Sequence, residues 1–124
     1  MLDAVRETVL TVAVGGRELW MAPDLPERYA AARRASAAPL LLPGFDEMLL
    51  GYGDRCAMLT RDEGRLLVPG GNGMFLPSVL HRGRVVGTWR RPARAGEPVR
   101  VTPFTDVPAV VRTALPRLTR RLPV

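Results

Sequence analysis

The sequence contains no lysine, no isoleucine and no glutamine, and it has a single cysteine and a single histidine. One cysteine cannot form a disulfide within the chain, which excludes a small secreted domain held together by disulfides. One cysteine and one histidine cannot supply the three or four ligands of a zinc finger or zinc ribbon. We therefore expect no metal and no cofactor.

Long apolar runs are also missing, since none approaches the roughly 18 residues that a transmembrane helix requires. The first ten residues, MLDAVRETVL, carry acidic side chains where a signal peptide has a basic segment followed by an apolar one. The codons of lysine and isoleucine are rich in A and T, so their absence indicates a bacterial genome rich in G and C. We expect a cytoplasmic, nucleoid-associated protein with no membrane partner.

The charge of the chain is unevenly distributed. The 124 residues are 47% hydrophobic, which suits one core of ordinary domain size, and their net charge is +6. Residues 1–78 hold eight arginines against ten acidic residues, a net charge of −2, whereas residues 79–124 hold ten against two, a net charge of +8. A basic segment favours a polyanionic partner such as DNA or RNA. An arginine-rich solvated surface is the alternative explanation.

The beginning of the chain is predicted to form a hairpin and a helix. Residues 8–14 alternate β-branched and apolar side chains, and two glycines that suit a tight turn separate them from a return strand at 17–21. A helix is expected over residues 24–35, because Asp24 and Glu27 form the pattern of a capping box. Its periodicity predicts three inward side chains, Leu25, Tyr29 and Ala32.

Short apolar segments separated by turn residues follow, and this spacing is typical of an antiparallel barrel or strongly curved sheet. Strands are expected at residues 40–42, 57–59, 65–68, 74–81, 84–90 and 99–102. Turns are expected at residues 61–64 and 82–83. The predicted fold class is α+β: a small curved antiparallel sheet or barrel-like β-domain, with one helix after the first hairpin and a C-terminal helix.

The C-terminal helix is predicted from apolar residues at spacings near 3.6. Asp106 is expected to cap this helix, and Pro108 is expected in its first turn. Pro116 interrupts the pattern, so the helix should kink or end there. The apolar stripe consists of Val107, Val110, Val111, Ala114, Leu115, Leu118 and Leu122.

Arginines near the second predicted hairpin are the main candidates for DNA contact. If Trp89 faces the core, Thr88 and Arg90 face solvent. Arg82, Arg84 and Arg90 then lie near one another on one strand pair, as a basic ribbon. Guanidinium groups bind phosphate through two parallel hydrogen bonds, which suits contact with a DNA backbone. A charged edge that prevents aggregation is the alternative.

The glycine-rich loop of residues 69–73, PGGNG, is expected to connect two strands. Consecutive backbone N–H groups of such a loop can form a nest for an anion. A bulged turn that needs positive φ angles is the simpler explanation. As a third possibility, the loop probes a DNA groove with Asn72, which carries its only hydrogen-bonding side chain.

The remaining reactive side chains are expected to have structural roles. Ser78 and His81 stand three residues apart on one predicted strand, so they point to opposite faces and do not form a catalytic pair. Acidic residues of the turn-rich stretch should cap turns and pair with arginines such as Arg55. These acidic residues are Asp46, Glu47 and Asp54. The side chains expected in the core are Cys56, Trp20, Phe45, Phe75 and Phe104.

Three long segments together carry a family resemblance: LLPGFDEMLLGYGDR (residues 41–55), VPGGNGMFLPSVL (68–80) and GRVVGTWRR (83–91). Their order and spacing resemble the C-terminal part of the bacterial winged helix DNA-binding domain-containing family. That family includes the AlkZ-like DNA glycosylases that unhook interstrand crosslinks. The matching positions include Phe45, Asp46 and Arg55, the glycines of residues 70–73, and Trp89 with Arg90.

The resemblance implies two regions and a DNA-associated role. Residues 1–38 would be the end of the last winged-helix region, and residues 39–124 a β-barrel-like C-terminal domain with its C-terminal helix. The catalytic signature of the glycosylase members is a Gln-x-Gln motif in the winged-helix part. Because the chain contains no glutamine, no catalytic residue is carried over.

We therefore predict a DNA-binding module that contacts the duplex backbone without sequence preference. The expected contacts are Arg82, Arg84, Arg90 and Arg91, with Arg55 and Asn72 as secondary contacts. Four phosphate contacts predict that log affinity falls with log salt at a slope of about −3.6. One alternative is an interaction module that docks on a separate winged-helix protein. Another is a crosslink-repair glycosylase active only within a longer assembly.

Overall fold

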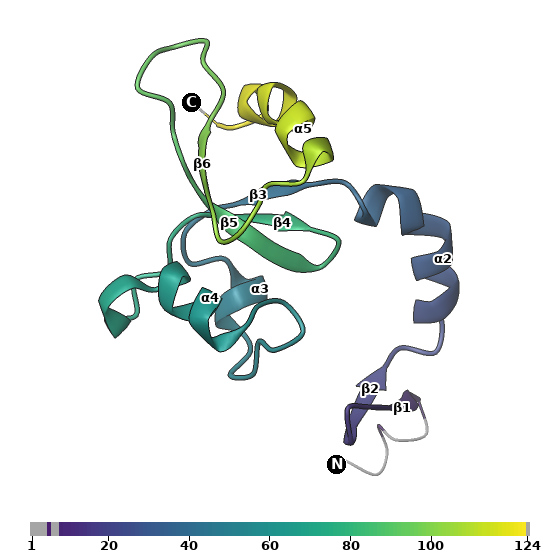
Figure 1. Ribbon diagram of the computed structural model, residues 1–124. Helices are drawn as coiled ribbons and strands as arrows, with labels where there is room; N and C mark the ends of the chain where they lie inside the picture. Colours follow the sequence, from purple (N-terminus) through teal and green to yellow (C-terminus); the bar gives the residue numbers. More distant parts are fainter. Residues whose placement is uncertain (1–4, 6–7, 124) are drawn as a thin grey trace. The chain divides into compact units, whose positions relative to one another are not determined.

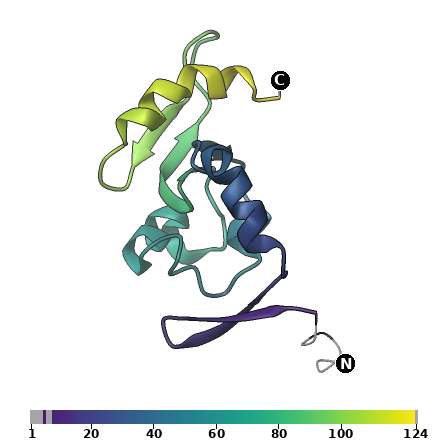
Figure 2. The ribbon, with the colours of Figure 1, turned by 90° about the vertical axis from the view of Figure 1, so that its right-hand side faces the viewer.

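The computed structural model describes residues 5 and 8–123, in two compact units, Met1–Ser36 and Ala37–Val124 (Figures 1 and 2). Residues 1–4, 6, 7 and 124 lie outside the description, and they include the start of the first predicted region and the last residue of the second. The predicted α+β class is confirmed: two antiparallel sheets are combined with helices. Across the described residues, neither sheet closes into a barrel.

The first unit consists of a hairpin and a helix, as predicted. Strands β1 (Leu10–Val14) and β2 (Arg17–Met21) pair in antiparallel register. The two turn glycines between them have φ angles of 58° and 76°, a conformation that glycine adopts more readily than any other residue. Helix α2 (Leu25–Ser36) follows.

The predicted inward face of α2 is wrong, because no residue of this helix is buried. Tyr29 is 61% exposed and Leu25 is 41% exposed, and Ala32 is exposed as well. Trp20, expected in the core, is 41% exposed, and its indole Nε1 donates a hydrogen bond to the Glu18 carboxylate at 2.9 Å. A two-stranded hairpin and a helix of this length are too small to bury their own apolar side chains.

The second unit is built on a four-stranded antiparallel sheet in the order β3-β4-β5-β6. Its strands are β3 (Leu40–Leu42), β4 (Ser78–His81), β5 (Arg84–Arg90) and β6 (Arg100–Pro103). Helices α3 (Glu47–Leu50) and α4 (Arg61–Leu67) lie on one side of the sheet, and α5 (Ala109–Arg120) lies on the other (Figure 1). The strands predicted at 40–42 and 84–90 are confirmed, and β4 and β6 confirm the other two with shifted ends.

The core beneath the sheet joins α3 and α4 to the central strands. The buried cluster consists of Leu49, Leu59, Leu67, Leu80 and Val85. Phe75 and Phe104 pack against it, in agreement with their predicted core positions. Burial of such side chains is the main source of stability for a unit of this size.

The region of residues 57–68 was predicted wrongly, as a strand, a turn and a second strand. Residues 56–58 form a turn, and Arg61–Leu67 form α4. The physical reason is a reciprocal cap: the Glu63 backbone N–H donates to Thr60 Oγ1 at 3.2 Å, and the Thr60 backbone N–H donates to the Glu63 carboxylate at 2.6 Å. Two satisfied N–H groups stabilise a helix that contains Gly64 in its interior.

The glycine-rich loop consequently follows a helix and does not connect two strands. Pro69–Gly71 form a single 3₁₀ turn, and the glycines at 70, 71 and 73 all have positive φ angles. The Asn72 carboxamide oxygen accepts a hydrogen bond from the Met74 backbone N–H at 3.1 Å. Residues 74–77, expected in a strand, precede β4.

Helix α5 differs from its prediction at its start, and of the two outcomes expected at Pro116, a kink or an end, the end is excluded. The residue before the helix is Pro108, and no side chain caps the helix there, so Asp106 is not the cap. The helix does not end at Pro116 but continues to Arg120. The stripe is confirmed at Val111, Ala114 and Leu118, which are buried, but Val110 is 52% exposed. Across the described residues, no helix combines the length and apolar character needed to cross a bilayer.

Two further core predictions are wrong. Cys56 is exposed, and Phe45 is 49% exposed with a φ angle of 62°. Phe45 immediately precedes Asp46, whose carboxylate accepts a hydrogen bond from the Met48 backbone N–H at 2.9 Å and caps α3. The positive φ at Phe45 directly precedes that cap, and about half of its side chain stays accessible to solvent.

Candidate nucleic-acid interface

The predicted basic ribbon is not formed, because Arg84 and Arg90 begin and end β5, a strand that also contains a bulge. Val79 pairs with Gly87 but Leu80 pairs with Val85, which leaves Val86 as an extra residue on β5. An extra residue shifts the alternation of side chains by one position. Arg84 and Arg90 lie at the two ends of β5. They are roughly 20 Å apart along the strand, at about 3.4 Å per residue.

The arginines at the start of β5 differ in their surroundings. Arg84 pairs with Glu63 on α4, with 3.4 Å between Nη2 and Oε2. Arg82 lies in the β4–β5 turn with a φ angle of 51°. The turn itself was predicted, and the structure confirms it. His81, at the end of β4, is half-buried and pairs in register with Arg84.

At the other end of β5, Arg90 lies directly opposite Arg100 on β6, and both side chains are exposed. Thr88 lies opposite Thr102 two residues along, on the same face. We call these four residues the Arg–Thr face. Among the described residues, neither Arg90 nor Arg100 has an acidic partner. Like charges placed directly opposite each other destabilise a sheet, and a bound anion would relieve that repulsion.

A groove of about 510 Å³ adjoins the Arg–Thr face. The walls include Leu76 and Pro77, from the segment before β4, and Trp89 and Arg91 from the end of β5. Trp89 is held in place by a hydrogen bond from its indole Nε1 to the Leu42 carbonyl oxygen at 2.9 Å. Arg91 donates to the Pro123 carbonyl oxygen at 2.7 Å. Strands β3 to β6 therefore give the groove a rigid frame.

The secondary candidates have local partners. The Arg55 guanidinium lies 5.0 Å from the centre of the Phe75 ring, and its Nε donates to the Leu49 carbonyl oxygen. Asn72 caps its own loop through Met74, as described above. Asp54 accepts a hydrogen bond from the Cys56 backbone N–H at 2.9 Å, so its capping role is confirmed.

Sequence reasoning missed Arg100. The nine residues between β5 and β6 conceal the register, so nothing local indicates that this arginine lies opposite Arg90. The sequence does show that Arg90 and Arg100 each stand two residues from a threonine, Thr88 and Thr102, so each arginine shares a strand face with its threonine. That spacing indicates a common surface only when the register of the two strands is known.

Comparison with known proteins agrees with the resemblance noted above. A model of the family described as DNA glycosylase AlkZ-like matches residues 1–123. A curated protein, the interstrand DNA cross-link repair glycosylase of Streptomyces sahachiroi, is 35% identical over 95 residues, which are 77% of this chain and 24% of that protein.

The solved structure of Streptomyces sahachiroi DNA glycosylase AlkZ is similar with a TM-score of 0.68 and 26% identity. The match covers 95% of this chain and 32% of that one. The chain thus spans about a quarter to a third of the relatives that it matches. With a family match along nearly its whole length, the chain belongs to the AlkZ-like DNA glycosylase family.

Proposed function

We propose that this chain is a DNA-binding module, corresponding to the C-terminal domain of an AlkZ-like glycosylase, that contacts the duplex backbone. The observation that carries this proposal is the pair Arg90 and Arg100, two exposed guanidinium groups directly opposite each other on adjacent strands. Guanidinium groups hold phosphate oxygens through paired hydrogen bonds. Thr88 and Thr102 add hydroxyl donors of the kind that position a backbone.

The contact set of the proposal is centred on the Arg–Thr face and extends to Arg91. Arg82 and Arg84 remain proposed contacts at the far end of β5, where they would meet a different stretch of backbone. Arg55 and Asn72 remain secondary contacts. Phosphate contacts carry no sequence information, so binding should be strongly salt-dependent and indifferent to sequence. Such a module belongs at the bacterial nucleoid in the cytoplasm.

Salt-titrated binding to a labelled duplex tests this proposal. The double variant Arg90→Ala/Arg100→Ala should bind more weakly, and the slope of log affinity against log salt should shrink by about 1.8, at 0.9 per lost phosphate contact. The matched control is Arg112→Ala/Arg117→Ala on α5, which removes the same charge and should change the slope little. Absence of duplex binding at low salt, or equal slopes for both double variants, would contradict the proposal.

Base excision is proposed to require the rest of a longer assembly. The chain contains no glutamine, and the carboxylate of Asp46 is engaged in capping α3. A crosslinked duplex incubated with this chain alone should therefore yield no abasic product, and detection of one would overturn this proposal.

A second candidate function, docking on a winged-helix partner, is favoured by the first unit. Its hairpin and helix expose Leu19, Trp20, Leu25 and Tyr29, and α2 has no buried residue. We propose that this apolar surface packs against the winged-helix part of an AlkZ-like protein. Calorimetric titration with the part of the Streptomyces sahachiroi relative that precedes the matching region should show binding. Trp20→Ser/Tyr29→Ser should abolish that binding, and unchanged binding would refute the assignment.

A further inference from the structure

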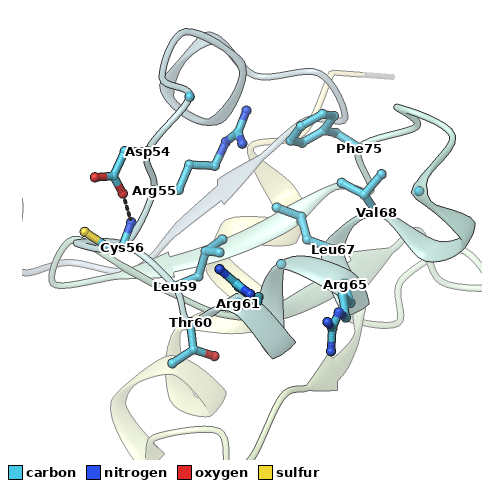
Figure 3. Close-up of a pocket in the computed structure, with 13 residues that line it drawn as sticks. Asp54, Arg55, Cys56, Leu59, Thr60, Arg61, Arg65, Leu67, Val68 and Phe75 are labelled. Carbon is cyan, nitrogen blue, oxygen red and sulfur yellow. Dashed lines mark hydrogen bonds between the residues drawn. The ribbon is translucent and has the colours of Figure 1, made fainter.

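A second concave site lies beside α4 in the same unit (Figure 3). We call it the α4 cleft, and its volume is about 720 Å³. That volume lies within the range of about 300–1,000 Å³ that is typical of small-ligand sites. The residues that define it are Arg55, Leu59, Arg61, Arg65, Leu67 and Phe75.

The floor of the α4 cleft is apolar. Leu59 and Leu67 are 6% and 1% exposed and belong to the core cluster, while Phe75 packs against that cluster from the edge. In Figure 3 the two leucines lie between Arg55 on one side and Arg61 and Arg65 on the other. An apolar surface flanked by cations suits a ligand that has a flat apolar ring and an anionic group.

The cations come from two elements. Arg61 and Arg65 stand one helical turn apart on α4, so their side chains leave the same face of the helix. Arg65 pairs with Asp62 at 3.0 Å, but both side chains are largely exposed, so the pair contributes little and is easily exchanged for another anion. Arg55 is held on the opposite wall by the Leu49 carbonyl oxygen.

The charge of the cleft is positive. Its lining holds three arginines against one acidic residue, Asp54, whose carboxylate accepts a hydrogen bond from the Cys56 backbone N–H. The Arg55 guanidinium and the Phe75 ring, 5.0 Å apart, together form a platform of the kind on which nucleic-acid bases stack.

We propose that the α4 cleft holds one unpaired nucleotide, with its base stacked on the Arg55–Phe75 platform and its phosphate between Arg61 and Arg65. This inference rests on the proposed DNA binding for the source of the nucleotide. The neighbouring residues Phe75 and Leu76 line the α4 cleft and the groove at the Arg–Thr face, respectively. Adjacent residues of the segment before β4 therefore contribute to both sites.

The test compares two labelled duplexes of one sequence, the first fully paired and the second with a single unpaired nucleotide. Stacking of one base predicts about tenfold tighter binding of the second duplex. Arg61→Ala/Arg65→Ala should abolish this preference, whereas Arg112→Ala/Arg117→Ala should leave it intact. Arg90→Ala/Arg100→Ala should weaken both duplexes and preserve their ratio, which separates this inference from the proposed function.

Arg61 and Arg65 are exposed, so their replacement by alanine should not unfold the chain. A thermal melt of each variant checks that a lost preference for the unpaired duplex is not caused by unfolding. Arg61→Lys/Arg65→Lys keeps the charge and should restore part of the preference. Equal affinity for the two duplexes, or a preference that survives in the alanine variant, would overturn the inference. If the chain binds free thymidine monophosphate but shows no preference for the duplex with the unpaired nucleotide, the cleft is a site for free nucleotides. That result would overturn the proposal that the nucleotide belongs to bound DNA.

Discussion

The indole Nε1 of Trp89 donates a hydrogen bond to the carbonyl oxygen of Leu42 at 2.9 Å, and this contact joins β5 to β3 across the intervening strand. Leu42 lies at the end of an edge strand only three residues long. Trp89 immediately precedes Arg90, so the same side chain that secures the edge also fixes the strand that carries the Arg–Thr face.

Replacing Trp89 with phenylalanine should therefore lower the free energy of unfolding by about 1–3 kcal/mol. The loss has two parts: the Leu42 carbonyl oxygen loses its indole donor, and the smaller ring leaves space beside the groove. Urea denaturation followed by circular dichroism would measure it. Trp20→Phe is the control, because that indole is exposed and bonds to Glu18 two residues away. Equal losses for the two variants would contradict the proposed anchoring role.

The approach of β6 to β5 leads to a second prediction, at Gly87. A Cβ atom there would lie 2.5 Å from the Thr102 carbonyl oxygen and 2.9 Å from the Pro103 Cα. Both contacts are with backbone, so neither can be relieved by a side-chain rotation. Gly87→Ala should lower the free energy of unfolding by at least about 1–3 kcal/mol.

The control for Gly87 is Gly53→Ala, since no atom of the described residues lies within 4 Å of a Cβ built at Gly53. That variant should be close to neutral. Thermal unfolding of both proteins would decide the matter, and a Gly87→Ala protein that melts at the temperature of the unsubstituted chain would show that β6 adjusts to the added methyl group.

Strong local signals were enough to predict part of this fold. The paired glycines at 15 and 16 and the Arg82-Gly83 turn each need positive φ angles, and both hairpins form where they were expected. Helix α4 was missed although Thr60 and Glu63 have the spacing of a capping box, because the run from Arg61 to Gly64 also suits a turn.

The candidate site was harder to predict because it depends on register. The bulge at Val86 leaves no trace in composition or periodicity, yet it shifts the alternation of side chains between Arg84 and Arg90. The same register brings Arg100 opposite Arg90 from ten residues away in sequence. Single side chains can be assigned to strands from sequence, but the pairs that create a charged surface arise only from the folded sheet.

Replacement of Ser78 should raise the free energy of unfolding, whereas the replacements at Trp89 and Gly87 should lower it. Ser78 is fully buried in β4, and its hydroxyl has no hydrogen-bond partner among the residues that the structure describes. A buried hydroxyl without a partner loses its hydration and gains nothing in return. Ser78→Ala should therefore raise the free energy of unfolding by about 1 kcal/mol. Ser36→Ala is the comparison, because that hydroxyl is exposed and donates to the Arg33 carbonyl oxygen.

The two serine variants should thus separate in urea denaturation, with Ser78→Ala more stable than the unsubstituted chain and Ser36→Ala within a few tenths of a kcal/mol of it. A clear loss of stability for Ser78→Ala would mean that its hydroxyl makes a contact with water that the surrounding strands require.

The pair between Arg84 and Glu63 leads to the last prediction, which tests whether Arg84 contacts DNA. The Glu63 side chain neutralises this arginine and also completes the cap of α4. Glu63→Gln removes the charge while keeping a side chain that can still complete a capping box. With Arg84 released from Glu63, duplex affinity should rise, and the slope of log affinity against log salt should steepen by at most about 0.9, the value of one full phosphate contact. Glu27→Gln on α2 makes the same change in net charge away from Arg84 and should leave the slope nearly unchanged. If both variants steepen the slope equally, net charge alone accounts for the effect and Arg84 is not a phosphate contact.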